Sequence, residues 1–454
     1  MTIPTQHRQY IWDTRYTVLK HLSVKGCAIV TNSLLLSRLW HVARVTILPP
    51  QWIQSINSLV RSFVFPFYPR PSLNFACRSK KEGGLGLINV EDQVLALHNI
   101  YVDRLLSNAR PNPLTGVINV LVRLHTGHNS VLPFLMAPRA FSHRLAKVPH
   151  LQHLAKLLQR LPTIEISPQW TPRMTRFIPM IRAVHPAPPP TNPVRFAQTI
   201  VIKDVIPYSF LEARYDDIYT ITTAKHRPLR NALIDGDYEW HPLIARQLHP
   251  RYQAEPAAGP VWINVRSFDH WVIATTSRST ANAMPRPPTL THQAKPGFLR
   301  RHWIQTAASS KYDLPAPDIP HSPSPGSLLS WTQWQRFWQM KIPHTVRNCW
   351  WRLLIKKLPT RLATRHAHQR TTLDSNCQLC GAPNEDDDHT IFHCPRKLSF
   401  WRVARYVLSI PLTIPEIWDV LNFRYQTDPS NMIKIAHVLQ VTWQMHWRCI
   451  FDEV

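Results

Sequence analysis

Four residues between positions 377 and 394 constrain the fold most, because their spacing is that of a metal site. Cys377 and Cys380 form a Cys-x2-Cys pair followed by Gly381, and His389 and Cys394 follow after a loop of eight residues. Zinc takes four soft or borderline ligands at tetrahedral angles, and a Cys-x2-Cys turn supplies two thiolates from one tight loop. The ligands predicted for one zinc ion are Cys377, Cys380, His389 and Cys394.

The fourth ligand has an alternative, since His393 directly precedes Cys394. We prefer Cys394 because thiolate is the softer ligand and because Ile391 and Phe392 are then free to pack inside the small fold. A redox Cys-x2-Cys pair would not need the His and Cys that follow it, and a disulfide would need an oxidising compartment. Unpaired structural thiols are the third alternative. With four protein ligands the zinc would be structural, because no position is left for water.

Three acidic residues stand directly before His389. Asp386, Asp387 and Asp388 either form a solvated acidic turn or supply a carboxylate that offsets local charge or hydrogen-bonds the imidazole. The remaining cysteines are scattered and adjoin apolar residues, so we expect ordinary buried thiols. They are Cys27, Cys77, Cys349 and Cys449.

Charge is the second constraint. The 454 residues include 53 Lys and Arg against 27 Asp and Glu, a net charge of +26, and the natural counterpart of such a chain is a polyanion. A short cationic helix leads into the Cys-x2-Cys pair, and a second basic helix follows Cys394. We expect these cations to contact RNA or DNA, with solvated helix charges as the alternative. They are Arg361, Arg365, Arg370, Arg396, Lys397, Arg402 and Arg405.

The hydropathy of the chain argues against a secretory signal peptide and against a membrane-spanning helix. Residues 1–16 lack the apolar run of a signal peptide, and no window reaches the roughly 18 uninterrupted apolar residues of a spanning helix. We therefore expect an intracellular chain, in the nucleus or the cytoplasm, with no membrane partner.

Proline clusters divide the chain, which has 42 Pro and only 11 Gly. Apolar residues spaced three and four apart predict helices on either side of these clusters. Some sheet is possible over about 199–277, where β-branched and aromatic residues gather. The expected fold class is mainly α with a small irregular zinc knuckle. The expected segments are the helical 1–110 and 111–183, the Pro-rich linkers 184–198 and 281–330, the uncertain α/β region 199–280 and the last domain, 331–454.

Five short motifs stand in the first hundred residues: Leu22-Ser-Val-Lys-Gly26, Asn32-Ser-Leu-Leu-Leu-Ser-Arg-Leu-Trp40, Leu48-Pro-Pro50, Trp52 and Lys81-Glu-Gly-Gly-Leu-Gly-Leu87. In this order they resemble the segment that follows the polymerase palm in reverse transcriptases of LINE-type (non-LTR) retrotransposons. The resemblance implies thumb-like helices that grip a template-primer duplex. The backbone contacts implied by the resemblance are Lys25, Arg38, Arg44 and Arg61, with solvated helix charges as the alternative.

The last domain carries further anchors in a fixed order. Besides the metal ligands they are Trp334-x3-Trp338, Ile342-Pro343, Leu358-Pro-Thr360, Trp401 and Trp443-x3-Trp447. This arrangement resembles the reverse-transcriptase zinc-binding domain (zf-RVT) of plant and fungal non-LTR elements, and we expect a fungal-like type. The resemblance implies the carboxy-terminal part of such a polymerase, with the remainder of that polymerase as a candidate partner.

One segment invites comparison with a polymerase active site. Tyr215-Asp216-Asp217 differs from the Tyr/Phe-x-Asp-Asp turn because the aromatic residue should stand at position 214, which is Arg214. Phosphoryl transfer needs paired metal-binding carboxylates. We therefore expect no catalytic residue, and a noncatalytic fragment whose zinc fold orients basic helices on RNA or DNA. An inert structural or decayed product and an active RNA-directed DNA polymerase subunit are the alternatives.

Overall fold

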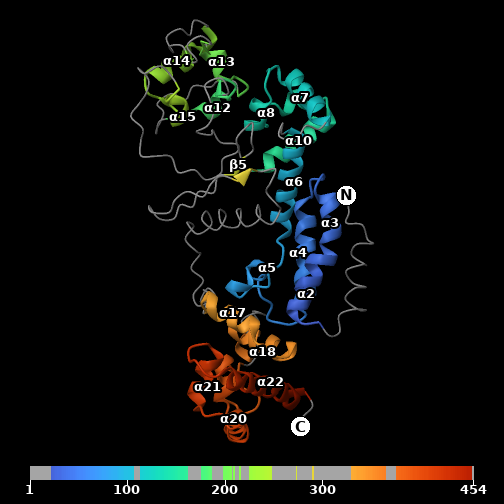
Figure 1. Cartoon of the computed structure of the whole chain (residues 1–454), viewed down its shortest axis with the longest axis vertical. Coiled ribbons are helices and arrows are strands. Elements are labelled where there is room, and N and C mark those ends of the chain that lie inside the picture. The colour runs from blue at the N-terminus through green and yellow to red at the C-terminus, as the bar shows by residue number, and fades with distance from the viewer. Residues whose placement is uncertain are drawn as a thin grey trace. The chain divides into compact units, whose positions relative to one another are not determined.

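The computed structural model is mainly helical, as the sequence predicts, and its described residues form two compact units (Figure 1). The first unit is drawn from Met1–Leu39, Leu48–Val90 and Ala316–Val454, and the second from Trp40–Ile47 and Glu91–Pro315. The residues described are 22–106, 113–161, 175–186, 198–206, 208–209, 214–215, 224–247, 272–273, 289–290, 329–363 and 375–451.

The amino-terminal part of the first unit is a set of amphipathic helices. The Ser23 hydroxyl accepts the Gly26 N–H at 3.0 Å and caps the first of them. The pattern predicts one helix over 13–48, but the structure inserts a π-helical turn at Thr31, whose hydroxyl donates to the Cys27 carbonyl. Residues 1–21 lie outside the described part. The elements are α2 (Val24–Val30), η1 (Thr31–Leu35), α3 (Ser37–Ala43), α4 (Pro50–Val64), α5 (Leu73–Cys77) and η2 (Lys80–Glu82).

A glycine-containing turn over residues 80–87, the 80–87 turn, follows these helices. Gly83 and Gly86 take φ angles of +82° and +67°, which residues with a side chain rarely adopt. The Asn32 side chain fixes the turn, since its amide donates to the Gly86 carbonyl at 2.9 Å and its oxygen accepts the Ile88 N–H at 3.0 Å. The turn is therefore held in one shape by a residue more than fifty positions earlier.

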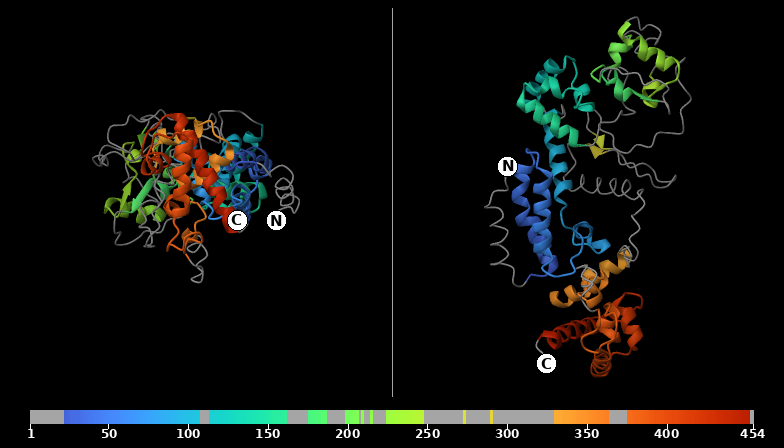
Figure 2. Two further views of the ribbon diagram at one scale, coloured as in Figure 1. Left: turned by 90° about the horizontal axis from the view of Figure 1, so that it is seen from below. Right: turned by 180° about the vertical axis from the view of Figure 1, so that it is seen from behind.

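Residues 329–363 and 375–451 form the carboxy-terminal module of the first unit. Its core is aromatic: Phe337, Trp350 and Phe423 are buried against one another, and the Trp350 indole donates to the Leu421 carbonyl at 2.8 Å. The long last helix packs along α18 (Figure 2). The helices are α17 (Trp331–Gln339), α18 (His344–Leu354), η7 (His389–His393), α20 (Pro395–Val407), α21 (Ile414–Leu421) and α22 (Pro429–Phe451).

Tryptophans of the carboxy-terminal module bind the 80–87 turn within the first unit. The Trp351 indole donates to the Gly83 carbonyl at 3.0 Å, and the Trp338 indole donates to the Lys80 carbonyl at 3.0 Å. Trp334 lies so close that a Cβ on Gly83 would stand 2.4 Å from its ring. Two segments separated by more than two hundred residues thus share one structural unit.

The second unit is built around an apolar core. Buried side chains such as Phe134, Phe141, Leu154 and Leu157 pack together at its centre. Apolar residues at helical spacing over 142–161 predict a helix that Pro149 bends or breaks. In the structure Pro149 stands in the first turn of the second of two helices. The helices are α6 (Val90–Leu106), α7 (Pro113–Thr126), α8 (Leu132–Met136), α9 (Ser142–Leu145), α10 (Pro149–Arg160), α12 (Met180–Ala183), α13 (Ile202–Val205), η4 (Ala224–His226), α14 (Arg227–Ile234) and α15 (Pro242–Ala245).

The strands of the described residues are short and pair two by two, antiparallel. Most fall in the 199–277 region, where the sequence predicts some sheet, but β1 and β6 stand in segments predicted as Pro-rich linkers. Residues 202–205 form α13 and no strand, and the Asp204 carboxylate accepts the Val201 N–H at its start. The pairs are β1 (Val184–Pro186) with β4 (Tyr238–Trp240), β2 (Tyr208–Ser209) with β3 (Arg214–Tyr215), and β5 (Val272–Ile273) with β6 (Thr289–Leu290).

Among the described helices, none combines the length and the apolar composition that a membrane-spanning helix needs. Asp216 and Asp217, which follow β3, lie outside the described residues.

Candidate metal centre

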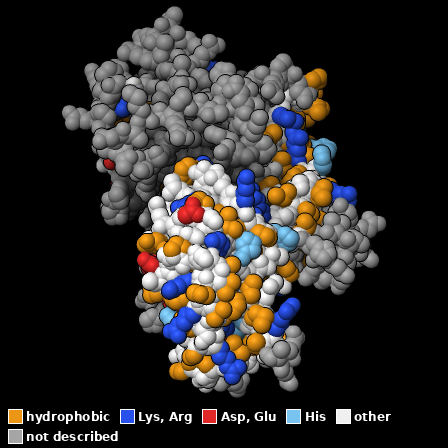
Figure 3. Space-filling view, turned by 60° about the horizontal axis from the view of Figure 1, so that its bottom comes forward, with side chains coloured by type: hydrophobic (Ala, Val, Ile, Leu, Met, Phe, Trp, Pro, Cys, Tyr) orange, Lys and Arg blue, Asp and Glu red, His pale blue; other side chains and the backbone are white. Residues whose placement is uncertain are grey.

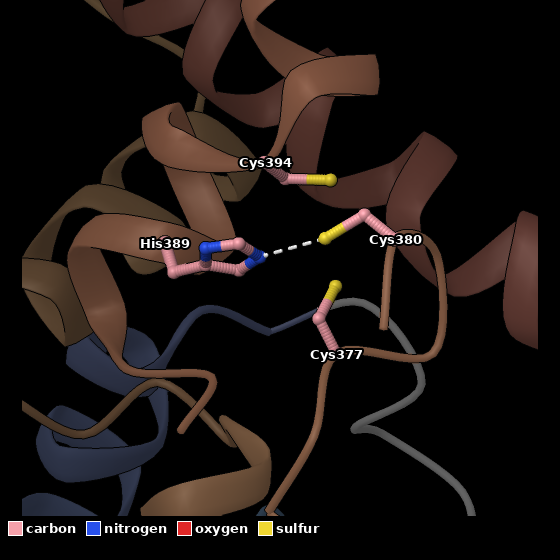
Figure 4. A group of neighbouring side chains, drawn as sticks. All are labelled: Cys377, Cys380, His389 and Cys394. Carbon is pink, nitrogen blue, oxygen red and sulfur yellow. Dashed lines mark hydrogen bonds between the residues drawn. The ribbon is translucent and has the colours of Figure 1, made fainter. Parts of the chain in front are cut away.

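A tight backbone turn brings the first two ligands together. The Gly381 N–H donates to the Cys377 carbonyl, and the Cys377 N–H donates to the Ala382 carbonyl, both at 2.8 Å. Gly381 takes a φ of +74°, a conformation that glycine adopts without strain. The turn folds back on itself, so the side chains of Cys377 and Cys380 leave it on the same side (Figure 4).

A π-helical turn supplies the other two ligands. In η7 the Cys394 N–H donates to the His389 carbonyl at 3.2 Å, a bond that spans five residues and places both side chains on one face. Asp386 starts this turn, since its carboxylate accepts the His389 N–H at 2.7 Å. Asp386 is exposed and caps a helical turn, and its carboxylate bonds the backbone of His389 and not the imidazole. An Asp three residues before a helix-forming stretch is the signal that could have found it.

The four predicted ligands converge on one point (Figure 4). Their Sγ and imidazole nitrogen atoms all lie within 4.8 Å of one another, and the Cys380 Sγ is 3.2 Å from the His389 Nε2. With Zn–S bonds of about 2.3 Å, two sulfur atoms of a tetrahedral site are about 3.8 Å apart, so the cluster needs only a small contraction to hold the ion. The three thiols and one imidazole suit one zinc ion.

The structure also decides between the two candidates for the fourth ligand. Cys394 is buried and belongs to the cluster, whereas the His393 side chain is exposed and does not. Ile391 and Phe392 point into the module, as predicted. Phe392 stacks on Trp401 with ring centroids 4.5 Å apart, and the Trp401 indole donates to the Ile391 carbonyl at 2.9 Å. These contacts anchor η7, which begins at His389, on α20.

The thiols differ in their readiness to ionise. Burial raises the pKa of Cys377 to about 12. Burial also acts on Cys380, but hydrogen bonds from the Ala382 backbone and from the neighbouring thiols outweigh it and hold the Cys380 pKa below its ordinary value. Zinc binds thiolates, so its binding must displace protons and weakens in acid.

Lys397 does not lie on a nucleic-acid surface, contrary to the prediction from the sequence. Its side chain is only 6% exposed, and its ammonium donates to the Thr390 carbonyl. Burial lowers its pKa, while Glu385 and the three ligand cysteines act to raise it. A centre of three thiolates, one imidazole and Zn²⁺ carries a net negative charge, which the buried ammonium offsets. Helical periodicity alone gives no sign of this role.

The other predicted cations occupy varied positions. On α20, Arg396, Arg402 and Arg405 are exposed, and Figure 3 shows Lys and Arg side chains spread over this side of the module with few acidic ones. Arg361 is half-buried, and Arg365 and Arg370 lie outside the described residues. In the amino-terminal helices Arg38 and Arg61 are exposed, and Lys25 and Arg44 are half-buried. Arg44 belongs to the second unit.

The metal centre lies in a stretch that matches a known family. Residues 323–401, which include all four ligands, match the family described as zinc-binding in reverse transcriptase. The chain has no match among curated proteins and none among solved structures. Converging ligands and a matching stretch together show a zinc-binding domain of the kind found in reverse transcriptases, suited to one zinc ion.

Proposed function

We propose that this chain is the nucleic-acid-binding, zinc-stabilised carboxy-terminal part of a LINE-type reverse transcriptase. One observation carries the proposal: α20, on which Arg396, Arg402 and Arg405 are exposed, begins directly after the metal ligand Cys394. A zinc ion that holds the Cys394 sulfur would therefore fix the start of a basic helix. The family match and the net charge of +26 support the same reading.

The mechanism is neutralisation of phosphates by cations held in a fixed orientation. Among the residues that the structure describes, no acidic side chain pairs with Arg396, Arg402 or Arg405. Three exposed guanidinium groups without acidic partners on one helix favour a polyanionic partner. Contacts of this kind release counterions from RNA or DNA, so binding should depend steeply on salt and little on sequence.

We propose that the chain binds nucleic acid and does not itself add nucleotides. Its Asp216-Asp217 pair departs from the polymerase turn at Arg214, and the family comparison found a zinc-binding domain without a polymerase catalytic domain. The rest of a retrotransposon polymerase is the proposed protein partner, and the nucleus or the cytoplasm the proposed compartment. Nucleotide incorporation by the purified chain that Asp216→Ala abolishes would overturn this part.

The test is binding of the zinc-loaded chain to single-stranded RNA and to duplex DNA at about 50 and about 200 mM salt. We expect affinity to fall by at least about tenfold between these salts, and the triple variant Arg396→Gln, Arg402→Gln, Arg405→Gln to flatten that dependence. Arg424→Gln is the matched control, because Arg424 already faces Asp419 at 3.9 Å. Binding no stronger than that of a scrambled basic peptide would instead indicate an inert product.

A further inference from the structure

A small cavity inside the first unit lies between the start of α2 and the start of α18. Its volume is about 20 Å³, and it opens in part to solvent. Its polar lining comes from both the amino-terminal helices and the carboxy-terminal module. The residues that matter here are Ser23, Lys25, Trp338, His344, Arg347 and Asn348.

The cavity gathers positive charge without a counterion. The pKa of Lys25 is lowered by burial and then by the neighbouring charges of Lys80 and Arg347, so three cations crowd together. No ion pair within the described residues includes any of the three. Arg347 donates one bond to the Met340 carbonyl, but its buried Nε has no partner. Lys25 and Arg347 are half-buried, and cations that are partly removed from water without a counterion are stabilised when an anion joins them.

The shape of the cavity restricts what can enter. A space of this volume holds one oxygen-sized atom, which matches a single non-bridging oxygen of a phosphate. The Trp338 ring forms one wall, with the Lys25 ammonium 5.7 Å from its centroid. Helix α18 begins after Pro343 without a side-chain cap, so its first N–H groups add positive potential near the opening.

We propose that this cavity binds one phosphate group of a nucleic-acid backbone, with a non-bridging oxygen between Lys25 and Arg347. The inference rests on the proposed function and names a site for one of its phosphate contacts. Lys25 belongs to α2, whereas Arg347 belongs to the carboxy-terminal module. The bound phosphate therefore joins the amino-terminal helices to the zinc-containing module, and the turn bound by Trp338 and Trp351 brings the two halves of the site together.

The test compares Lys25→Gln with Lys25→Arg and Lys341→Gln in the full zinc-loaded chain. Lys341 is exposed and close in sequence to α18 but does not line the cavity, so Lys341→Gln removes the same charge elsewhere. One measurement is the rise in melting temperature caused by inorganic phosphate relative to chloride at equal ionic strength. The other is the salt dependence of binding to single-stranded RNA.

We expect Lys25→Gln to lose the phosphate-induced rise and to lower the slope of log affinity against log salt by about one, as loss of one phosphate contact requires. Lys25→Arg and Lys341→Gln should keep the phosphate response. If the wild type binds RNA and Lys25→Gln matches it in both measurements, the inference is wrong while the proposed function stands. If inorganic phosphate acts on the wild type but RNA does not bind, the nucleic-acid assignment fails and the cavity is a site for free phosphate.

Discussion

The metal-binding loop of the carboxy-terminal module and the second unit reach stability by different routes. Around Cys377 and Cys380 the chain forms a tight turn with few apolar side chains, so four ligand atoms would hold it together. The second unit instead buries a continuous apolar cluster around Phe134 and Phe141. The difference shows what each region depends on: the first on an ion, the second on the exclusion of water.

Removal of zinc should produce the largest difference in stability between the two regions. Chelation should abolish hydrogen-exchange protection over η7 and the start of α20, because structural zinc binding is worth about 10–16 kcal/mol in small zinc folds and is largely folding energy. Protection over α8 and α10 of the second unit should remain. Hydrogen exchange read by mass spectrometry, with and without chelator, measures both at once. Equal loss in both regions would contradict the comparison.

Phe141→Ala should produce the converse effect. Phe141 is fully buried, and truncation of a buried Phe costs about 3–5 kcal/mol through lost burial and the cavity left behind. We expect the second unit to unfold at lower denaturant while zinc content stays at one ion per chain. Val120→Ala is the control, since Val120 is 62% exposed on α7 and should change stability by less than about 0.5 kcal/mol. Zinc loss in Phe141→Ala would show that the two regions are not independent.

Alanine substitutions at two glycines test whether the stability of the carboxy-terminal module also depends on the 80–87 turn. Gly83→Ala should cost about 2–4 kcal/mol, because its left-handed φ is strained for alanine and its Cβ would meet the Trp334 ring. Gly86→Ala carries the same kind of strain but has open space, so about 1–2 kcal/mol is expected. Denaturant unfolding followed by tryptophan fluorescence distinguishes them. Equal costs would mean that the Trp334 contact is unimportant.

The smallest predicted effect is a change in the folding stability of the second unit with pH. Burial, and then the neighbouring His185, lower the pKa of His241 to about 4, and its Nδ1 accepts the Leu243 N–H at 3.3 Å. Between the unfolded pKa of about 6.5 and the folded pKa, the unfolded chain holds a proton that the folded chain lacks. Stability should therefore be fully present above about pH 6.5 and fall by about 1 kcal/mol towards pH 5, after allowance for solvent screening.

His241→Asn checks this response, because the Asn side chain keeps an acceptor near the Leu243 N–H and cannot take up a proton. The variant should lose less stability than the wild type between pH 7 and pH 5. Comparison of variant and wild type at each pH cancels the loss of zinc that acid causes in both. Parallel curves for the two proteins would contradict the prediction.

Local patterns were sufficient to predict the metal site. The spacing of Cys377, Cys380, His389 and Cys394 specifies a geometry over eighteen residues, and the structure brings those four ligands together. Pro149 likewise acts through its own ring, so the helix break that it causes is predictable. These inferences need no knowledge of distant contacts.

Features set by distant contacts were not predictable. The bond from Trp351 to Gly83 spans 268 positions, and no spacing rule connects them. Burial of Lys397 depends on where η7 lies over α20, which a helical pattern does not specify. In the second unit, apolar residues at helical spacing predict helices but fit many packing arrangements. The sequence therefore did not predict how these helices pack.

Metal analysis of the purified full chain, wild type and Cys380→Ser, tests the central claim most directly. The four converging ligands predict one zinc per wild-type chain, and a markedly lower content after Cys380→Ser, because only three ligands then remain. A wild-type chain without zinc, or a Cys380→Ser chain with the same zinc content as the wild type, would contradict it.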